Sequence, residues 1–288
     1  MDEASVVAGT VYLVGAGPGD PGLLTRRGHR ILQQCDVVLF DALVSPEVIA
    51  LARPGATRMD VGKKGHGRSA LQPDIEALMV AHARGGRCVV RLKGGDPFLF
   101  GRGSEEADAL AAAGIPFEIV PGVSSALAVP AYAGIPVTDR RLASSLAIVT
   151  AACAAPGAAE QSIARAAGAD TVVVLMGLSA LPRVTSALAA HGRSEVTPAA
   201  AISAGTTRRQ RTVVATLGTL ASAARDAALT SPVLIVVGDV VRMRSRLAWF
   251  EPDTDAAAGR RERDETIAIR GPVRTDGRTG NRSPLEAL

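Results

Sequence analysis

Short apolar segments alternate with longer helical patterns along the first half of the chain, and this alternation constrains the fold more than any other feature. The segments are continuous apolar runs, as in strands buried on both faces of a sheet. The predicted strands are Val11–Gly15, Val37–Phe40, Thr57–Val61, Cys88–Leu92 and Phe117–Val120. Helical spacing covers Leu23–Gln34, Gln72–Ala83 and Gly103–Ala113. This order predicts an α/β fold with a mostly parallel sheet.

A second alternating set follows a turn-rich break at Gly134–Ala143. Its predicted strands are Leu146–Thr150, Thr171–Leu175, Ala199–Ser203, Thr212–Ala215 and Val233–Val237, and its predicted helices are Ala158–Ala167, Leu181–His191 and Leu220–Ala228. Because no helix separates the third strand from the fourth, we expect an antiparallel pair there. We expect one α/β domain over 9–142, a second over 143–250, mostly parallel sheets and an active-site cleft between the domains.

Composition narrows the class of protein. Aromatic residues make up only 3% of the chain, which argues against nucleic-acid recognition by base stacking. The net charge of +4 fits either plain solubility or an anionic partner. Cys35, Cys88 and Cys153 lie far apart, so we expect neither a disulfide framework nor a metal site.

The ends of the chain carry weaker signals. No signal peptide or long apolar run is apparent, so we expect a cytoplasmic protein. Residues 251–288 hold few large apolar side chains and are expected to be a disordered tail.

The segment Gly17–Gly22 matches the pattern G-x-G-x-x-G after a strand, and Asp41 lies about twenty residues further on. This spacing is typical of a dinucleotide-binding loop. Pro18 and Pro21 weaken that interpretation, because each removes a backbone N–H that would donate to a pyrophosphate. A tight strand-to-helix turn without a ligand is the plain alternative.

Two further loops follow predicted strands. Lys93-Gly94-Gly95-Asp96-Pro97 exposes backbone groups beside a carboxylate, and Pro121-Gly122-Val123-Ser124-Ser125 brings hydroxyl groups to the start of a helix. Ligands of open parallel sheets bind at the carboxyl ends of the strands. We therefore expect the three loops to converge on one crevice.

These loops resemble the tetrapyrrole (corrin/porphyrin) methylase family. The resemblance covers roughly residues 10–245 and rests on Val14–Thr25, Asp41–Val44, Val61–Lys64, Arg91–Gly103, Pro121–Ala126 and Ala133–Thr138. It implies a homodimeric, S-adenosylmethionine-dependent enzyme of two α/β domains. The long match over Arg91–Gly103 favours C-methylation of uroporphyrinogen III to precorrin-1 and precorrin-2, at C-2 and C-7, for sirohaem or cobalamin synthesis.

The resemblance also assigns roles by position. The expected cofactor contacts are Pro18, Gly94, Gly95, Asp96, Leu99, Ser124, Ser125, Met176 and Gly205. Asp41 matches the family's proton acceptor and Lys63 its proton donor, although we favour pairing of Lys63 with a substrate carboxylate because an unperturbed lysine stays charged. Basic residues beside the loops suit a polycarboxylate tetrapyrrole. The expected substrate contacts are Arg26, Lys64, Lys93, Arg102 and Arg140, within a wider basic group that adds Arg68, Arg91 and Arg141.

The sequence departs from the family pattern at two places. Asp139 stands where a histidine is common, and Ala151-Ala152 where Gly-His is common. An acidic residue facing a polyanion is unfavourable unless Arg140 or Arg141 neutralises it.

Other functions remain open on the sequence. They are another precorrin methyltransferase, a dinucleotide-dependent oxidoreductase resting on Gly17–Gly22, and a non-catalytic binding module. With no appended dehydrogenase/chelatase module in this sequence, we expect a protein other than a multifunctional sirohaem synthase.

Overall fold

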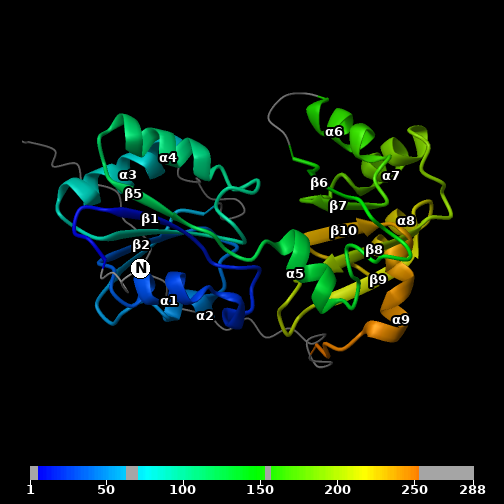
Figure 1. The fold of residues 1–288 in the computed structure, drawn as a ribbon, viewed down its shortest axis with the longest axis horizontal. Helices are drawn as coiled ribbons and strands as arrows, with labels where there is room; N and C mark the ends of the chain where they lie inside the picture. Colours follow the sequence, from blue (N-terminus) through cyan, green and yellow to red (C-terminus); the bar gives the residue numbers. More distant parts are fainter. Residues whose placement is uncertain (1–5, 63–70, 153–156, 253–288) are drawn as a thin grey trace, which may run out of the picture. The chain divides into compact units, whose positions relative to one another are not determined.

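A computed structural model describes residues 6–62, 71–152 and 157–252 of the chain. These residues fall into one compact unit that contains two five-stranded sheets (Figure 1). In the described part of the chain, no helix is both long enough and apolar enough to cross a membrane.

The first sheet is parallel throughout, with the strand order β3-β2-β4-β1-β5. Its strands are β1 (Val11–Gly15), β2 (Val37–Phe40), β3 (Thr57–Asp60), β4 (Val89–Lys93) and β5 (Phe117–Val120). All five were predicted to within one residue at each end. Because β4, β1 and β5 are neighbours, the loops that follow them emerge side by side at the carboxyl edge of the sheet.

Helices cover both faces of this sheet (Figure 1). The helices are α1 (Arg26–Leu32), α2 (Pro46–Ala50), α3 (Gln72–Arg84) and α4 (Gly103–Ala112). Tyr12 and Val14 of β1 pack with Leu32 of α1, whereas Leu13 packs with Met79 of α3. Successive side chains of β1 thus enter cores on opposite faces, which explains why the strand is apolar at consecutive positions.

The second sheet has the order β6-β7-β10-β8-β9. Its strands are β6 (Leu146–Thr150), β7 (Thr171–Leu175), β8 (Pro198–Ser203), β9 (Arg211–Thr216) and β10 (Val233–Val237). The predicted antiparallel pair β8–β9 is confirmed, but β10 is also antiparallel to both β7 and β8. Only β6 and β7 are parallel, so the prediction of a mostly parallel sheet holds for the first sheet alone. The reason is that β10 is a fully buried apolar run, which has the same pattern in either direction.

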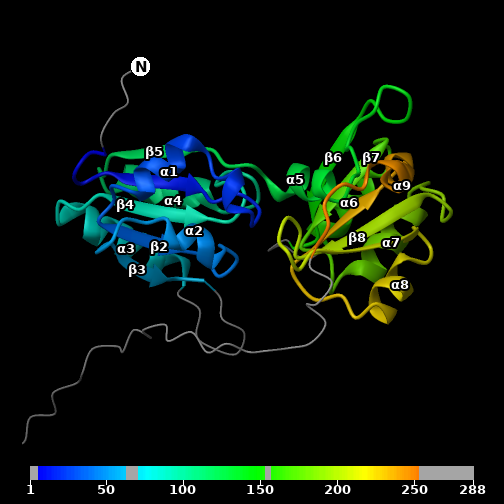
Figure 2. The ribbon, with the colours of Figure 1, turned by 90° about the horizontal axis from the view of Figure 1, so that it is seen from below.

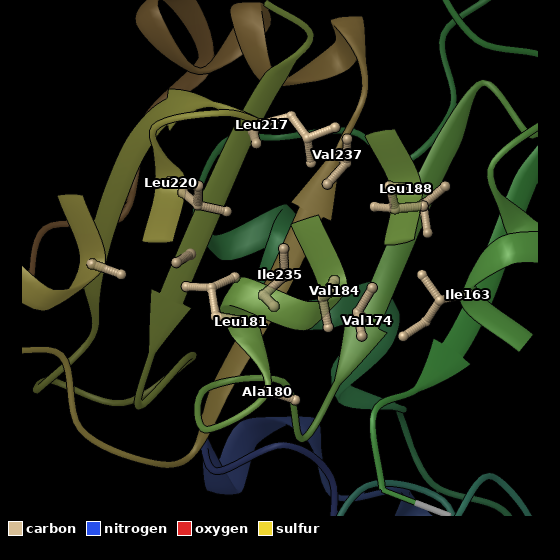
Figure 3. Packing of buried hydrophobic residues seen from close by; sticks show 14 of the residues in the cluster. Ile163, Val174, Ala180, Leu181, Val184, Leu188, Leu217, Leu220, Ile235 and Val237 are labelled. Carbon is tan, nitrogen blue, oxygen red and sulfur yellow. The ribbon is translucent and has the colours of Figure 1, made fainter. Parts of the chain in front are cut away.

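Helices α6 (Ala158–Ala166), α7 (Leu181–Ala190) and α8 (Leu220–Asp226) cover one face of the second sheet. Figure 3 shows Leu181, Val184 and Leu188 of α7 against Val174 and Ile235 of the strands. These three helical residues share one face by their i, i+3, i+7 spacing.

The other face of the second sheet is covered by α5 (Ser125–Tyr132) and the 3₁₀ turn η2 (Asp239–Met243). Helix α5 follows β5 of the first sheet along the chain but lies beside the second sheet (Figure 2). Its Val129 packs in the same core as Ile202 and Leu234 of the second sheet. The short helix α9 (Arg244–Leu247) comes after η2. The expected domain boundary near residue 142 stays a prediction.

Candidate active site

The two glycine loops predicted from the sequence are hydrogen-bonded to each other. The Gly17 amide donates to the Gly95 carbonyl at 3.2 Å, and the Gly95 amide donates to the Gly17 carbonyl at 2.7 Å. The third loop is tied in by Asp96, whose carboxylate accepts from the Gly122 amide at 3.0 Å and from the Phe98 amide at 2.8 Å. The loops after β1, β4 and β5 therefore form one connected structure.

Glycine is required where these loops cross, because their backbones touch. A Cβ atom on Gly15 would lie 2.5 Å from the Gly122 Cα, and one on Gly122 would lie 2.2 Å from the Gly95 carbonyl oxygen. No side chain fits at those distances without a shift of the backbone. Gly17 and Gly95 also have φ angles of 77° and 67°, a region that favours glycine.

A cavity of about 1210 Å³ lies beside the first glycine loop. It is lined by residues that follow strands of the first sheet and by residues that follow strands of the second sheet. Four of the predicted cofactor residues line it: Pro18, Ser125, Met176 and Gly205. The predicted residues that line the cavity thus come from both halves of the chain, and their contact with a cofactor stays a prediction.

The other predicted cofactor residues lie next to the cavity lining. A Cβ on Gly95 would lie 3.6 Å from the amide nitrogen of the lining residue Ser125, and a Cβ on Gly94 would lie 3.7 Å from the Cβ of the lining residue Leu43. Leu99 packs against the core that contains Val129. Asp96 uses its carboxylate on the loops' own amides, so its direct contact with a ligand stays a prediction.

The second-sheet side of the cavity carries strained backbone. Met176, Ala204 and Thr206 have φ angles of 55°, 47° and 64°, and all three line the cavity. Such conformations are costly for residues with side chains and are concentrated at binding sites. Met176 is also 49% exposed, so its side chain is not packed in the core.

Thr206 joins the two sides of the cavity, a role that sequence reasoning missed. Its hydroxyl accepts from the Asp20 amide at 3.2 Å, and its own amide donates to the buried Gln210 side chain at 2.8 Å. A Cβ on Gly205 would lie 2.4 Å from the Val129 side chain, so the turn also lies close against α5. The Gly205–Gln210 turn is therefore held in place from several directions.

An aromatic cluster lies beside the first loop. Tyr132 donates its hydroxyl to Asp20 at 2.6 Å, and its ring contacts Trp249 and Phe250, each with 5.0 Å between ring centres. Burial, together with the bond to Asp20, raises the pKa of Tyr132 to about 12. Phe250 lines the cavity. The scarcity of aromatic residues was noted from the sequence, but their clustering depends on tertiary structure.

The first loop is poorly suited to a pyrophosphate. The amides of Ala16, Gly17, Asp20 and Gly22 all donate to acceptors within the protein. The following helix α1 begins only at Arg26, and its N-terminus is capped by the Thr25 side chain. A dinucleotide loop instead turns its amides and its helix N-terminus toward the phosphates.

Asp41, the predicted proton acceptor, belongs to a cluster of four charged residues. Arg91 donates to Asp41 at 2.5 Å and to Glu106 at 2.9 Å. The Lys93 ammonium lies 2.9 Å from Glu106 and 3.8 Å from Asp41. Burial and the neighbouring Arg91 lower the pKa of Lys93, while Glu106 and Asp41 oppose that shift.

This cluster corrects the expectation for two basic residues. The side chains of Arg91 and Lys93 are only 2% and 3% exposed and contact carboxylates of the protein itself. They do not lie on a surface open to substrate, as the basic group predicted from the sequence would require. Glu106 was missed, because a glutamate inside a helix pattern is ordinarily a surface residue.

Three other predicted substrate residues, Arg26, Arg102 and Arg140, are exposed but do not line the cavity. Arg26 lies at the start of α1, Arg102 pairs with Glu105 at 2.7 Å, and Arg140 is at the surface. Lys63, Lys64 and Arg68 lie outside the described residues. Substrate contacts by this group stay predictions.

The unusual Asp139 is neutralised, as the sequence required. Arg141 donates two hydrogen bonds to its carboxylate, each at 2.9 Å, and these bonds lower the pKa of Asp139 to about 2. The negative charge at this position is therefore paired within its own turn.

The cavity combines an apolar wall with hydroxyl groups. Val129, Ile202 and Leu234 give it an apolar wall, and Ser125 and Thr207 add hydroxyl groups. Such a lining suits a nucleoside with a compact cationic centre better than a polyphosphate. In the described part of the chain, no group of acidic, histidine or cysteine side chains is arranged to hold a metal ion.

Comparison with known proteins agrees with this geometry. The family model of the tetrapyrrole (corrin/porphyrin) methylases matches residues 10–221. Siroheme synthase 2 of Aeromonas hydrophila is 49% identical over 250 residues, which are 87% of this chain and 53% of that protein. Siroheme synthase of Tolumonas auensis is 50% identical over 246 residues, 85% of this chain and 52% of that protein. The chain thus spans about half the length of these relatives.

Solved structures give the same relationship. The Thermus thermophilus uroporphyrin-III C-methyl transferase, crystallised with S-adenyl homocysteine, is 40% identical with a TM-score of 0.70 over 81% of this chain and 99% of that one. A cobalt precorrin-4 methyltransferase is 29% identical with a TM-score of 0.71 over 81% of this chain and 96% of that one. On this evidence, the chain belongs to the tetrapyrrole (corrin/porphyrin) methylase family of methyltransferases.

Proposed function

We propose that this protein transfers methyl groups from S-adenosylmethionine to uroporphyrinogen III, giving precorrin-1 and then precorrin-2 by methylation at C-2 and C-7. The observation that carries the proposal is the cavity lined by the first glycine loop and Ser125 on one side and by the strained Met176 and Thr206 on the other. The likeness to the Thermus thermophilus enzyme over nearly its whole length supports the choice of substrate.

Methyl transfer mainly requires that the methyl donor and the acceptor carbon are aligned. When bound, S-adenosylmethionine supplies an activated methyl group on a positively charged sulfur. Methyl transfer to a pyrrole carbon is an in-line displacement, so the rigid loops contribute by fixing the direction of approach. The ring must then lose a proton, and we propose Asp41 as the acceptor, which is supported by its 31% exposure immediately before the lining residues Ala42 and Leu43.

The main alternative function is that of another precorrin methyltransferase of the same family. The cobalt precorrin-4 methyltransferase has a similar TM-score but lower identity to this chain. The two candidates differ in the tetrapyrrole they accept and not in the methyl donor. Substrate competition therefore distinguishes them.

A dinucleotide-dependent oxidoreductase is disfavoured by the first loop, because its Gly17, Asp20 and Gly22 amides already donate within the protein. That alternative requires binding of NAD(P)H, which fluorescence titration of the purified protein would detect. We expect no change in nicotinamide fluorescence. A saturable change would favour the oxidoreductase.

The proposal is tested by anaerobic incubation with S-adenosylmethionine and enzymatically made uroporphyrinogen III, followed by mass spectrometry. We expect masses shifted by one and then two methyl groups, with matching release of S-adenosylhomocysteine. Methylation of a precorrin but not of uroporphyrinogen III would select the alternative methyltransferase. Cofactor binding without turnover of either would indicate a binding module.

We further propose a homodimer and a cytoplasmic location, which rest on the family resemblance and on the sequence. Sedimentation velocity of the purified protein would test the first. A monomer at micromolar concentration would contradict it.

A further inference from the structure

The charged cluster around Asp41 has one accessible member. Glu106 is completely buried, Arg91 and Lys93 are nearly so, and Asp41 alone is substantially exposed, at 31%. Burying several charges costs several kcal/mol each, and apolar side chains of similar size often stabilise a protein as well or better. Stability alone is therefore a weak reason for such a cluster below an exposed carboxylate.

The contacts form a chain that ends at Asp41. Glu106, on α4, accepts from the Arg91 guanidinium through Nε, which leaves Nη2 directed at Asp41. The other terminal nitrogen of Arg91 donates to the main-chain carbonyls of Leu39 and Leu92, each at 3.4 Å. Arg91 is thus held by Glu106 and by two main-chain carbonyls, and its Nη2 group sets the direction of the Asp41 carboxylate.

The charges in the cluster balance. Arg91 and Lys93 supply two positive charges, and Asp41 and Glu106 supply two negative ones. If the charge of Glu106 were removed, Asp41 would be the one carboxylate beside the two cations Arg91 and Lys93. If the charge of Lys93 were removed, Asp41 and Glu106 would both depend on Arg91. At these short separations an unbalanced charge acts strongly on its neighbours, because the effective dielectric constant is only about 20.

Other charged groups near the cluster have partners or lie further out. Glu105 and Arg102 pair with each other at the surface and act on Lys93 and Glu106 only through space. Asp60, at the end of β3, accepts from the Gly62 amide at 2.9 Å. Gln72 donates to Glu106 at 3.4 Å and adds no charge.

We propose that Glu106, Arg91 and Lys93 are positioning residues, which fix the direction of the Asp41 carboxylate and balance its charge during methyl transfer. This inference rests on the proposed function, because it requires Asp41 to act on the tetrapyrrole. It also reassigns Lys93 from substrate binding to support of Asp41.

Three variants separate this role from a merely structural one. Glu106→Gln removes a negative charge at nearly constant shape, Lys93→Met removes a positive one, and the double variant restores neutrality. We expect each single variant to lower kcat at least about tenfold, with KM and the Kd for S-adenosylhomocysteine within about twofold of the wild type. The double variant should recover most of the lost kcat, since the charges again balance.

A matched control is Asp108→Asn, which removes one negative charge from an exposed position on the same helix, α4. Its kcat should equal that of the wild type. Circular dichroism and S-adenosylhomocysteine binding by calorimetry report whether each variant is folded. If Glu106→Gln fails to fold, Lys93→Met compared with the double variant still decides the question.

Several results would overturn the inference. A rise in KM with unchanged kcat for Lys93→Met would show that Lys93 binds substrate. Unchanged kinetics in both single variants, or a double variant no better than the worse single one, would exclude charge balance. Failure of the proposed function would give a different result, because the wild-type protein itself would then not methylate uroporphyrinogen III.

Discussion

At the scale of single residues, Asp96 holds two of the glycine loops together, a role that was not predicted from the sequence. Its carboxylate bridges the loop after β4 and the loop after β5, through the amides of Phe98 and Gly122. Hydrogen bonds to a charged group contribute roughly 1.5–3 kcal/mol each. We expect Asp96→Ala to weaken S-adenosylhomocysteine binding at least about tenfold by calorimetry, because the loops lose this clamp. Asp96→Asn, which keeps an acceptor, should lose less, and equal affinity in all three proteins would contradict the clamp.

At the scale of elements, Asp170 joins the starts of β6 and β7. One oxygen of its carboxylate accepts from the amide and the hydroxyl of both Ser144 and Ser145, at 2.8–3.0 Å. These bonds lower the pKa of Asp170 to about 2 from a usual value near 4. The stabilisation is therefore present above about pH 4 and is lost as the pH falls toward 2. We expect Asp170→Asn to lower Tm at pH 7, and the gap to the wild type to shrink between pH 4 and 2 in calorimetric scans. Asp108→Asn serves as the control, and a gap independent of pH would contradict this role.

Elements also show how far the sequence could lead. Buried parallel strands are continuous apolar runs with turns at their ends, so β1 to β5 and their three glycine loops were predictable. The direction of β10 was not, because a run apolar at every position does not show which neighbour it pairs with. Nor was Glu106, because burial of a charged residue depends on partners that come from distant segments. Local patterns thus located the site, while its electrostatics required the tertiary structure.

At the scale of the whole molecule, the reaction rate of two buried thiols measures how often the folded protein opens. Cys35 and Cys88 are buried in the core of the first sheet, and burial raises their pKa values to about 11 and about 12. In a Cys153→Ser background, we expect both to react with a disulfide reagent at pH 8 at least about a hundredfold more slowly than free cysteine. Saturating S-adenosylhomocysteine should slow the reaction further, because ligand binding stabilises the folded state. Rapid labelling of the native protein would contradict the burial of these thiols.

The main-chain packing at Gly15, Gly95 and Gly122 has a consequence for redesigning the enzyme. Loops that touch through their peptide backbones offer no side chains to exchange, so substitutions there are expected to reduce the yield of folded protein before they alter ligand preference. Acceptance of an unnatural methyl or alkyl donor would have to be evolved from the opposite wall, around Met176 and Thr207, where side chains face the cavity. A mutagenesis library confined to that wall should therefore contain more folded, catalytically altered variants than one spread evenly over the cavity.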